Sequence, residues 1–264
     1  MGADEWSDRG EGHVAVVTGG GSGIGARIGT WLARNGVDVV LADLDESGAR
    51  TVADDVEADG GTARGVYTDV TDESSVGTLF ETVEAEFGRL DYLFPNAGIV
   101  GPVELDETSI ADWRQVIDVN LNGAFLTVTE GLDLLTADGG GHAVLTASIS
   151  GRQPKPVMVP YRCSKAAVIM LVHCLAEPLG PEVKINALCP GPIDTPLLRD
   201  LQERRAEARG MTFEEFRDEK SASMALGRTP EPEDLLGLLD YLLFGDAFVT
   251  GHEFYLDGGG YQVM

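Results

Sequence analysis

A phenol and an ammonium stand four residues apart in the stretch Tyr161-Arg162-Cys163-Ser164-Lys165, and a hydroxyl, Ser148, precedes the tyrosine by thirteen residues. On a helix, side chains four residues apart share one face, about 5–6 Å apart at Cβ. An ammonium in that position favours the phenolate and lowers the pKa of the tyrosine from its usual value of about 10. A phenol poised in this way can exchange a proton with an alcohol oxygen. The pattern predicts acid–base chemistry on an alcohol, although a helix-surface tyrosine and lysine without a role would also fit the spacing alone.

A glycine-rich string near the N-terminus is the second signal. The apolar run at residues 13–17 predicts a buried strand, and the spacing of Ile24, Ile28 and Trp31 predicts a helix. Between them the sequence reads Thr18-Gly19-Gly20-Gly21-Ser22-Gly23-Ile24-Gly25. A strand, a glycine turn and a helix N-terminus can bind a pyrophosphate, because the backbone approaches closely and the free amides hold the anion. A glycine turn without a ligand is an equally good interpretation of this string taken alone.

An acidic residue, Asp43, ends the second predicted strand at residues 37–42 and follows Gly25 by eighteen residues. A carboxylate at this position accepts hydrogen bonds from the adenosine ribose hydroxyls. The same charge repels a 2′-phosphate, and no basic residue stands close by in the sequence. The neighbouring positions are neutral: Gly20, Gly21, Ser22 and Leu44. Asp43 therefore favours NAD over NADP, and the alternative is a solvated loop residue.

Composition limits the class of protein. A chain of 264 residues with 43% hydrophobic content fits a single domain, residues 1–264, with a substantial core. No run approaches the ~18 apolar residues of a membrane span, and the acidic residues 1–6 lack the apolar stretch of a signal peptide. The three cysteines match no zinc spacing and suit a reducing cytoplasm. We therefore expect a cytoplasmic protein without a metal site.

The net charge of −25 argues against nucleic-acid or anionic-membrane partners, because both need a basic surface. The acidity fits either adaptation to high internal salt or a codon usage rich in Asp, Ala, Gly and Arg. It leaves a small neutral or charged molecule as the expected partner.

Strands and helices alternate along the chain, which predicts parallel βαβ units and an α/β, doubly wound, Rossmann-type sheet of about seven strands. Apolar runs predict strands at 13–17, 37–42, 64–68, 90–94, 143–147, 183–188 and 253–256. Helical periodicity predicts helices at 24–35, 46–58, 73–87, 110–135, 159–179 and 235–244. Ligands of such sheets bind beyond the carboxyl ends of the strands. The polar or turn residues Asp43, Asp69, Asn96, Ser148 and Pro190 follow predicted strands and could share one crevice.

From about Gly12 to Gly260 the chain resembles the short-chain dehydrogenase/reductase family. The segments that carry the resemblance are Thr18–Gly25, Asp69-Val70, Asn96-Ala97-Gly98, Asn120, Ser148, Tyr161 to Lys165, Pro190 to Thr195 and Asp257-Gly258-Gly259. The order and the intervals of these segments make the match specific.

The resemblance implies NAD as the cofactor and a role for each matching position. The implied cofactor-binding residues are Gly19, Gly21, Ser22, Gly23, Ile24, Gly25, Asp43, Leu44, Asp69, Val70, Asn96, Ala97, Gly98, Tyr161, Lys165, Pro190, Gly191, Ile193 and Thr195. Among these, Asp69 would bond the adenine amino group, and Ile193 and Thr195 would orient the carboxamide.

The implied catalytic residues are Asn120, Ser148, Tyr161 and Lys165. Ser148 would bond the substrate oxygen, Tyr161 would exchange its proton, and Lys165 would hold the nicotinamide ribose and lower the tyrosine pKa. Asn120 would kink its long helix and hold a water that links Lys165 to solvent. The implied activity is hydride transfer between NAD(H) and a secondary alcohol or ketone.

Residues 197–228 correspond to the lid over the substrate in this family. The lid contains four arginines that could clasp a phosphate or carboxylate, or could form ordinary surface ion pairs: Arg199, Arg204, Arg205 and Arg209. The length of the lid and the chain ending at 259–264 are similar to the polyol, sugar-alcohol and diol dehydrogenases. The alternatives are a 3-oxoacyl-thioester or hydroxysteroid ketone reductase, and an NAD-binding sensor or scaffold without turnover.

The predicted helix 159–179 contains the stretch 166–172, which is apolar on every side and requires cover on two faces. One cover is the sheet, and the other would be a second copy of the chain. Together with the family resemblance, this predicts a homodimer or homotetramer.

Overall fold

The computed structural model describes residues 7–137, 139–245 and 247–260. Within these residues, seven parallel strands form one sheet in the order β3-β2-β1-β4-β5-β6-β7. The strands are β1 (Val14–Thr18), β2 (Asp38–Asp43), β3 (Ala63–Tyr67), β4 (Tyr92–Phe94), β5 (Gly141–Thr146), β6 (Val183–Pro190) and β7 (Glu253–Leu256). The predicted doubly wound α/β sheet is confirmed. The predictions for residues 1–6 and 261–264 lie outside the described residues.

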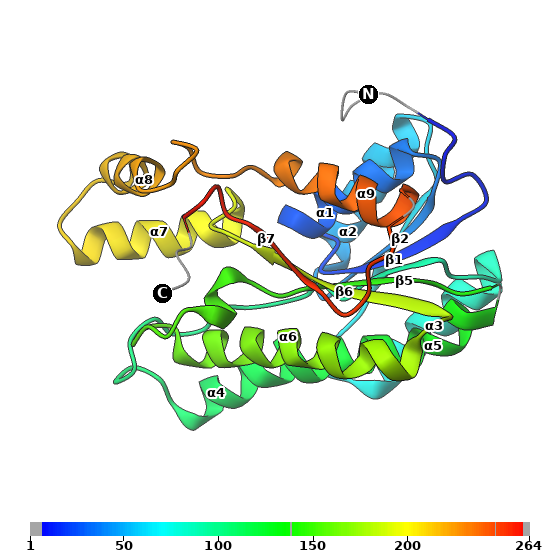
Figure 1. Cartoon of the computed structure of the whole chain (residues 1–264), viewed down its shortest axis with the longest axis horizontal. Coiled ribbons are helices and arrows are strands. Elements are labelled where there is room, and N and C mark those ends of the chain that lie inside the picture. The colour runs from blue at the N-terminus through cyan, green and yellow to red at the C-terminus, as the bar shows by residue number, and fades with distance from the viewer. Residues whose placement is uncertain (1–6, 138, 246, 261–264) are drawn as a thin grey trace.

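Helices cover both faces of the sheet (Figure 1). One face carries α1 (Gly23–Arg34), α2 (Glu46–Ala58) and α9 (Leu236–Phe244). The other carries α3 (Glu73–Phe87), α5 (Gly123–Ala137) and α6 (Val159–Leu179), with α4 (Ile110–Ile117) beside α6. Short turns precede α6, at Ile149–Arg152, and α9, at Pro232–Leu235.

Both faces of the sheet are buried, and alternate side chains of a strand pack into two different hydrophobic cores. In β1, Val14 and Val16 pack with α3, α5 and α6, whereas Ala15 and Val17 pack with α1, α2 and α9. Because the strands are parallel, their carboxyl ends all lie at one edge of the sheet. The residues that follow each strand therefore lie together at that edge. The core thus supplies a rigid base for the loops that follow β1, β2, β4, β5 and β6.

The long helix expected at 110–135 is broken in two. Between α4 and α5 lies one π-helical turn, Asp118–Asn122, whose wider backbone spacing displaces Asn120 from the regular pattern. The Asn120 side chain accepts a hydrogen bond from the Ile99 backbone N–H at 2.8 Å and donates one to the Ile99 carbonyl at 2.9 Å. The break therefore falls where a kink is predicted, and it turns Asn120 toward the loop after β4.

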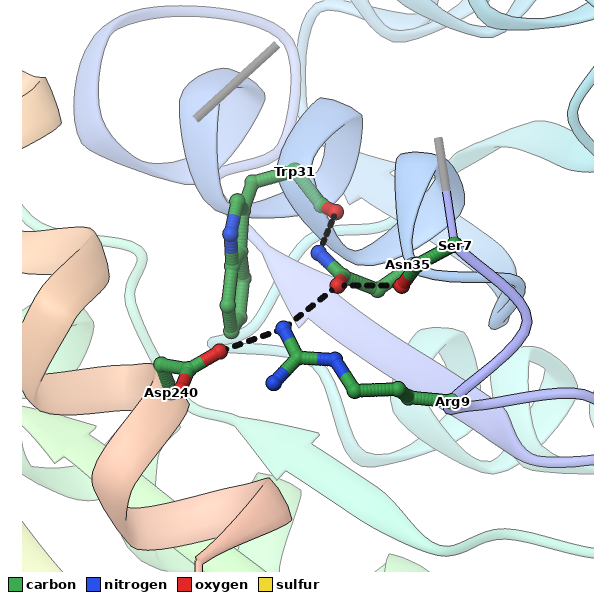
Figure 2. Close-up of polar contacts among 5 residues, drawn as sticks. All are labelled: Ser7, Arg9, Trp31, Asn35 and Asp240. Carbon is green, nitrogen blue, oxygen red and sulfur yellow. Dashed lines mark hydrogen bonds and ion pairs between the residues drawn. The ribbon is translucent and has the colours of Figure 1, made fainter. Parts of the chain in front are cut away.

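The first described residues tie two helices of one layer together (Figure 2). Asn35 ends α1, and its side-chain oxygen accepts hydrogen bonds from Ser7 at 2.9 Å and from Arg9 at 2.8 Å. The Asn35 amide donates to the Trp31 carbonyl, and Arg9 continues to Asp240 of α9. This chain of contacts fixes α1 against α9, and so fixes the helix whose N-terminus meets the glycine turn.

The segment predicted to be a lid, residues 197–228, contains two helices that the sequence does not predict as separate elements, α7 (Pro196–Ala208) and α8 (Phe213–Ala222). Thr195 caps α7 by accepting a hydrogen bond from Leu198 N–H, and Thr212 caps α8 in a reciprocal pair with Glu215. The two helices lie side by side outside the three layers, at the left of Figure 1.

By length and composition alone, α6 could cross a membrane, since it has 21 residues and contains an 18-residue window with a mean hydropathy of 1.2. Its packing shows another use of the apolar residues. Val168, Ile169 and Val172 are buried against the sheet, and the helix also carries the buried charges of Arg162 and Lys165. The described α6 is a core helix of the fold.

Candidate active site

A network of buried and partly buried side chains joins the ends of β1, β4 and β5. The Asn96 amide donates to the Thr18 carbonyl at 3.0 Å, and its side-chain oxygen accepts from the Thr146 hydroxyl at 3.0 Å. The Thr18 hydroxyl accepts from the backbone N–H groups of Asn96 and Ala97 at 3.0 and 3.2 Å. These bonds hold the predicted turn Asn96–Gly98 against the glycine string. Sequence reasoning misses Thr18 and Thr146 as site residues, because their partners are remote in the chain.

The glycine turn leaves no room for side chains. Gly19 has a φ of +66°, and a Cβ on Gly25 would lie 2.1 Å from the Gly19 carbonyl oxygen. Side chains cap the first turns of α2, α3, α4, α7 and α8, but Ser22 at the start of α1 makes no such bond. The first amides of α1 are therefore left for an anion, which fits the phosphates of a dinucleotide.

Asp43 stands beside this turn. One carboxylate oxygen accepts from Gly21 N–H at 2.9 Å and the other from Asp45 N–H at 2.9 Å. Each oxygen keeps a further lone pair for a hydroxyl. The exposed Leu44 follows it. Asp43 is thus fixed by backbone groups rather than by a basic side chain.

The loop after β3 contains the predicted adenine-side residues. The Asp69 carboxylate accepts from the backbone and hydroxyl of Thr71 at 2.9 and 2.7 Å. Val70 is buried against Gly123, where a Cβ would lie 2.7 Å from a Val70 methyl group. The neighbouring Thr68 hydroxyl is buried and has no hydrogen-bond partner in the described part of the chain. The structure therefore places Asp69 and Val70 on one ordered turn.

The loop after β6 closes over the glycine turn. Gly191 N–H donates to the Leu256 carbonyl at 2.8 Å, which ties the Pro190 end of β6 to β7. Ile193 is buried in the core shared with α1, and a Cβ on Gly23 would lie 3.5 Å from Thr195. The predicted residues of β6 and those of the glycine turn are thus brought together.

Asn120 and Lys165 meet at Gly98. A Cβ on Gly98 would lie 3.2 Å from the Asn120 side-chain oxygen and 3.4 Å from Lys165 Nζ. Lys165 is 3% exposed, and its ammonium donates to the Thr146 carbonyl at 2.6 Å. Asn120 also donates to the Ser164 hydroxyl at 3.0 Å. Gly98 therefore lies against both polar groups. Ser164, which the sequence does not single out, links Asn120 to α6, the helix that carries Lys165.

Ser148 and Tyr161 form the other half of the site. Burial raises the pKa of Tyr161 above its ordinary value and outweighs the lowering effect of a hydrogen bond with Ser148. Lys165 Nζ lies 5.9 Å from the centre of the tyrosine ring, and burial lowers its own pKa to about 8. The expected lowering of the tyrosine pKa by the lysine is thus wrong for this structure, because desolvation dominates both groups.

All three cysteines are unpaired: Cys163 and Cys174 are exposed, and Cys189 is buried. Burial has the largest effect on the Cys189 thiol and raises its pKa to about 12, although the thiol lies close enough to Ser148 and Lys165 for both to lower that pKa. Within the described ranges, no group of three or more His, Cys, Asp or Glu side chains is placed to hold a metal ion.

The family model described as short chain dehydrogenase matches residues 13–206. The chain belongs to the short-chain dehydrogenase family. Its glycine turn, Asn120 and the Ser148, Tyr161 and Lys165 group occupy one edge of the sheet, which agrees with this membership.

Curated relatives are similar to this short-chain dehydrogenase over almost the whole chain. Cis-4-hydroxycyclohexanecarboxylate dehydrogenase of Sinomonas cyclohexanicum is 37% identical over 250 residues, which cover 94% of this chain and 96% of that protein. Cyclohexanol dehydrogenase of an Acinetobacter strain is 35% identical over 248 residues, 93% of each. The NADP-dependent (R)-specific alcohol dehydrogenase of Lentilactobacillus kefiri is 32% identical and covers 96% of this chain and 98% of its own.

Solved structures are similar in fold as well. Levodione reductase superposes with a TM-score of 0.88 at 28% identity over 94% of this chain and 97% of its own. A variant of actinorhodin polyketide ketoreductase with NADPH has a TM-score of 0.90 at 29% identity, over 96% and 98%. This short-chain dehydrogenase is an oxidoreductase that binds a nicotinamide cofactor and interconverts secondary alcohols and ketones.

Proposed function

We propose that this enzyme transfers hydride between NAD(H) and a small ring-bearing secondary alcohol or its ketone, with Tyr161 as the proton-exchanging group. The observation that carries the proposal is that Ser148 bonds Tyr161 while Lys165 Nζ lies 5.9 Å from the centre of the Tyr161 ring and beside Gly98, at the sheet edge that also holds the glycine turn. A sensor or scaffold without turnover would not need these three groups together.

Each of these residues has a task that its surroundings support. The nicotinamide ring supplies the hydride acceptor or donor when the cofactor is bound. Ser148 and the Tyr161 hydroxyl bond the substrate oxygen and stabilise charge that develops on it. Lys165 would hold a ribose hydroxyl of the bound cofactor and let the proton pass on, and Asn120 would hold a water beside Lys165. The buried positions of Lys165 and Asn120 exclude bulk water from this path.

The carboxylate of Asp43 supports NAD as the preferred cofactor. Its two oxygens are aligned by Gly21 and Asp45, so they can accept from two ribose hydroxyls, and they would repel a 2′-phosphate. The relative from Lentilactobacillus kefiri is named as NADP-dependent and the ketoreductase contains NADPH, so both cofactors are used among similar proteins.

The names of two relatives support a cyclohexane-sized substrate, cyclohexanol in one and a hydroxycyclohexanecarboxylate in the other. A secondary alcohol on a six-membered ring has the same reacting group, a secondary hydroxyl, as the small polyols and diols that the lid length suggests. The rival inside the family is reduction of a larger ketone with NADPH, which the ketoreductase neighbour represents.

Initial rates test the proposal. Cyclohexanols, acyclic diols, sugar alcohols, 3-hydroxyacyl thioesters and hydroxysteroids would each be assayed with NAD and with NADP. We expect turnover of a ring alcohol with NAD, and in Asp43→Ser a shift of the NAD:NADP ratio of kcat/KM by about tenfold to hundredfold toward NADP. Turnover with NADP alone would overturn the cofactor choice. Cofactor binding without turnover of any alcohol would favour the sensor.

We further propose that the enzyme is a homodimer or homotetramer of the cytoplasm. The outward face of α6 presents an apolar stripe at helical spacing, Cys163, Ala166, Met170 and Cys174, with Met170 55% exposed. A second copy of the chain would cover this stripe. The unpaired cysteines support a reducing compartment. Light scattering of wild type and Met170→Glu measures the assembly, and an unchanged mass in the variant would remove α6 from the interface.

A further inference from the structure

Three cations of the lid converge on one buried ring. Phe216 of α8 is 1% exposed, and the cationic groups of Arg205, Arg209 and Lys220 lie 5.7, 5.5 and 5.4 Å from its ring centre. A cation near an aromatic face gains about 0.5–1 kcal/mol at an exposed site. Three like charges around one ring repel one another, so the ring alone does not account for the arrangement.

Two further cations from outside the lid extend this group. Arg162 of α6 is buried and lies close enough to Arg205 for the charge of Arg205 to lower its pKa, after the larger effect of burial. Lys155, from the loop that follows Ser148, acts on Lys220 in the same direction. We name Lys155, Arg162, Arg205, Arg209 and Lys220 the cationic cluster. It gathers five of the 19 basic residues of a chain with a net charge of −25.

Much of this positive charge has no protein partner. Arg209 forms a two-point ion pair with Glu219 at 3.0 and 3.1 Å. Among the residues that the structure describes, neither Arg205 nor Lys220 forms an ion pair. Burial and the neighbouring charge of Arg205 lower the pKa of Lys220, and they outweigh the opposite effect of Glu219. An anion in this place would remove the repulsion.

The cationic cluster lies beside the reacting groups. Leu198 and Leu201 of α7 pack in one apolar cluster with Val100, Met158 and Tyr161. Arg205 follows Leu201 by one helical turn, which is a rise of about 5–6 Å along α7. Arg162 directly follows Tyr161, and its guanidinium is fixed by the carbonyls of residues 153 and 157 at 3.0 and 2.7 Å. A small molecule whose alcohol carbon lies at Tyr161 can therefore extend a second group toward Arg205.

From this geometry we propose that the lid binds a carboxylate group of the substrate. Arg205 and Lys220 would contact the carboxylate directly, and Arg162 would add a nearby positive charge that is held in place by the backbone. The inference rests on the proposed function for the reaction itself and adds the substrate class, a secondary hydroxy acid or keto acid. The carboxylate is separated from the carbinol carbon by a few bonds, as in a ring acid. The strongly acidic surface would otherwise disfavour such an anion, so a local cationic site is needed to bind it.

A pair of substrates of the same shape tests the charge alone: 4-oxocyclohexanecarboxylate and 4-oxocyclohexanecarboxamide, reduced with NADH. We expect kcat/KM of the wild-type enzyme to be about tenfold to hundredfold higher for the carboxylate, the gain of one charge-assisted contact. In the double variant Arg205→Gln/Lys220→Gln, the preference falls to within about threefold, mostly through KM. The matched control is Arg217→Gln, since Arg217 lies on α8 with Lys220 but is next to the ring of Phe213 rather than that of Phe216. We expect this variant to keep the wild-type ratio of kcat/KM between acid and amide.

Equal efficiency for acid and amide in the wild-type enzyme would overturn the inference and leave the proposed dehydrogenase function standing. If Arg217→Gln lost the preference for the carboxylate to the same extent, the preference would come from the overall charge of the protein, and the inference would also be overturned. Calorimetry with cyclohexanecarboxylate and its amide covers the case in which neither ketone reacts. Selective binding of the acid, lost in the double variant, would support the carboxylate site while the proposed reaction fails. Equal binding of both would overturn the site.

Discussion

The cofactor side of the molecule and the lid are held together by different forces. At the cofactor side, partly buried hydrogen bonds join Thr18, Asn96 and Thr146 across three strands, and Gly25 packs directly on backbone. The predicted lid has buried apolar contacts at Leu201 and Phe216, but its ion pairs are exposed, such as Arg209–Glu219, whose side chains are 48% and 46% exposed. Breaking the hydrogen-bond network costs about 1–3 kcal/mol, whereas an exposed pair contributes about 0–1 kcal/mol.

This difference separates two tasks of the enzyme. A nicotinamide cofactor keeps one shape through the reaction, so its site can be rigid and shaped by backbone atoms. The predicted lid contributes Leu198, Leu201 and three members of the cationic cluster, Arg205, Arg209 and Lys220, and we propose that they meet a substrate that must enter and leave. We expect the lid to open at low free energy while the cofactor side stays closed. The following changes test that contrast, from the largest expected effect to the smallest.

Tyr161→Phe removes only the hydroxyl and should leave the cofactor side intact. We expect kcat to fall by about 10²–10⁴-fold, because no other group accepts the alcohol proton in its place. The dissociation constant for NADH, measured by fluorescence titration, should change by less than about twofold. A variant with substantial turnover would show that Tyr161 is not the proton-exchanging group.

Gly25→Val should damage the cofactor side itself. A Cβ at this position would lie 2.1 Å from the Gly19 carbonyl oxygen and 2.6 Å from the Asn96 amide, and both are part of the buried network. We expect the free energy of unfolding to fall by about 2–3 kcal/mol, with loss of NAD binding. Denaturant unfolding and calorimetry measure the two effects.

Gly237→Ala is the matched control, because Gly237 lies in α9 and its Cβ would meet nothing within 4 Å. Alanine in a helix should stabilise the protein by about 0.5–1 kcal/mol. If the two glycine variants destabilised the protein equally, the close packing of the turn would not be the cause.

The same division explains what can be predicted from the sequence. The strands are predictable because each is a short apolar run buried on both faces, as β1 shows with Val14–Thr18. The glycine turn and Asp43 are predictable because a steric demand and a charge stand at fixed places after a strand. These are local properties, and the sequence order of the elements then determines the parallel sheet.

Other features depend on contacts between distant parts of the chain. Thr146 matters because it bonds Asn96, fifty residues away, and Lys165. The raised pKa of Tyr161 depends on burial, which the sequence spacing of tyrosine and lysine does not show. The cationic cluster combines α6, α7, α8 and a loop, and no single helix pattern contains it. Such features could not be predicted from residue spacing.

Lys165 should make the free energy of unfolding depend on pH. Burial lowers its pKa to about 8, below the value of 10.5 for a free lysine side chain. Between these values the unfolded chain binds more protons than the folded protein, so the free energy of unfolding rises with pH. From pH 8 to roughly pH 9.5 the expected rise is about 1–2 kcal/mol. Tyr161, with a raised pKa, has the opposite effect only as pH passes about 10.

Lys165→Met should abolish this rise, as measured by urea unfolding at a series of pH values. Lys184→Met is its control, since Lys184 bonds the Ala247 carbonyl away from the site, and the wild-type slope should persist in it. If the free energy of unfolding rose equally with pH in the wild type and in Lys165→Met, the buried ammonium would be solvated more fully than its surroundings indicate.

The smallest effect is expected in the lid. Glu219→Gln breaks the two-point pair with Arg209, but both side chains are about half exposed, so water replaces the lost contacts. We expect a loss of less than about 1 kcal/mol in the free energy of unfolding, and none in about 0.5 M NaCl, where screening removes the attraction. Asn96→Ala, its counterpart at the cofactor side, loses bonds to Thr18 and Thr146 and should cost about 1–3 kcal/mol at either salt concentration. A loss in Glu219→Gln as large and as insensitive to salt would mean that the lid is anchored as firmly as the cofactor side, and substrate entry would then need another route.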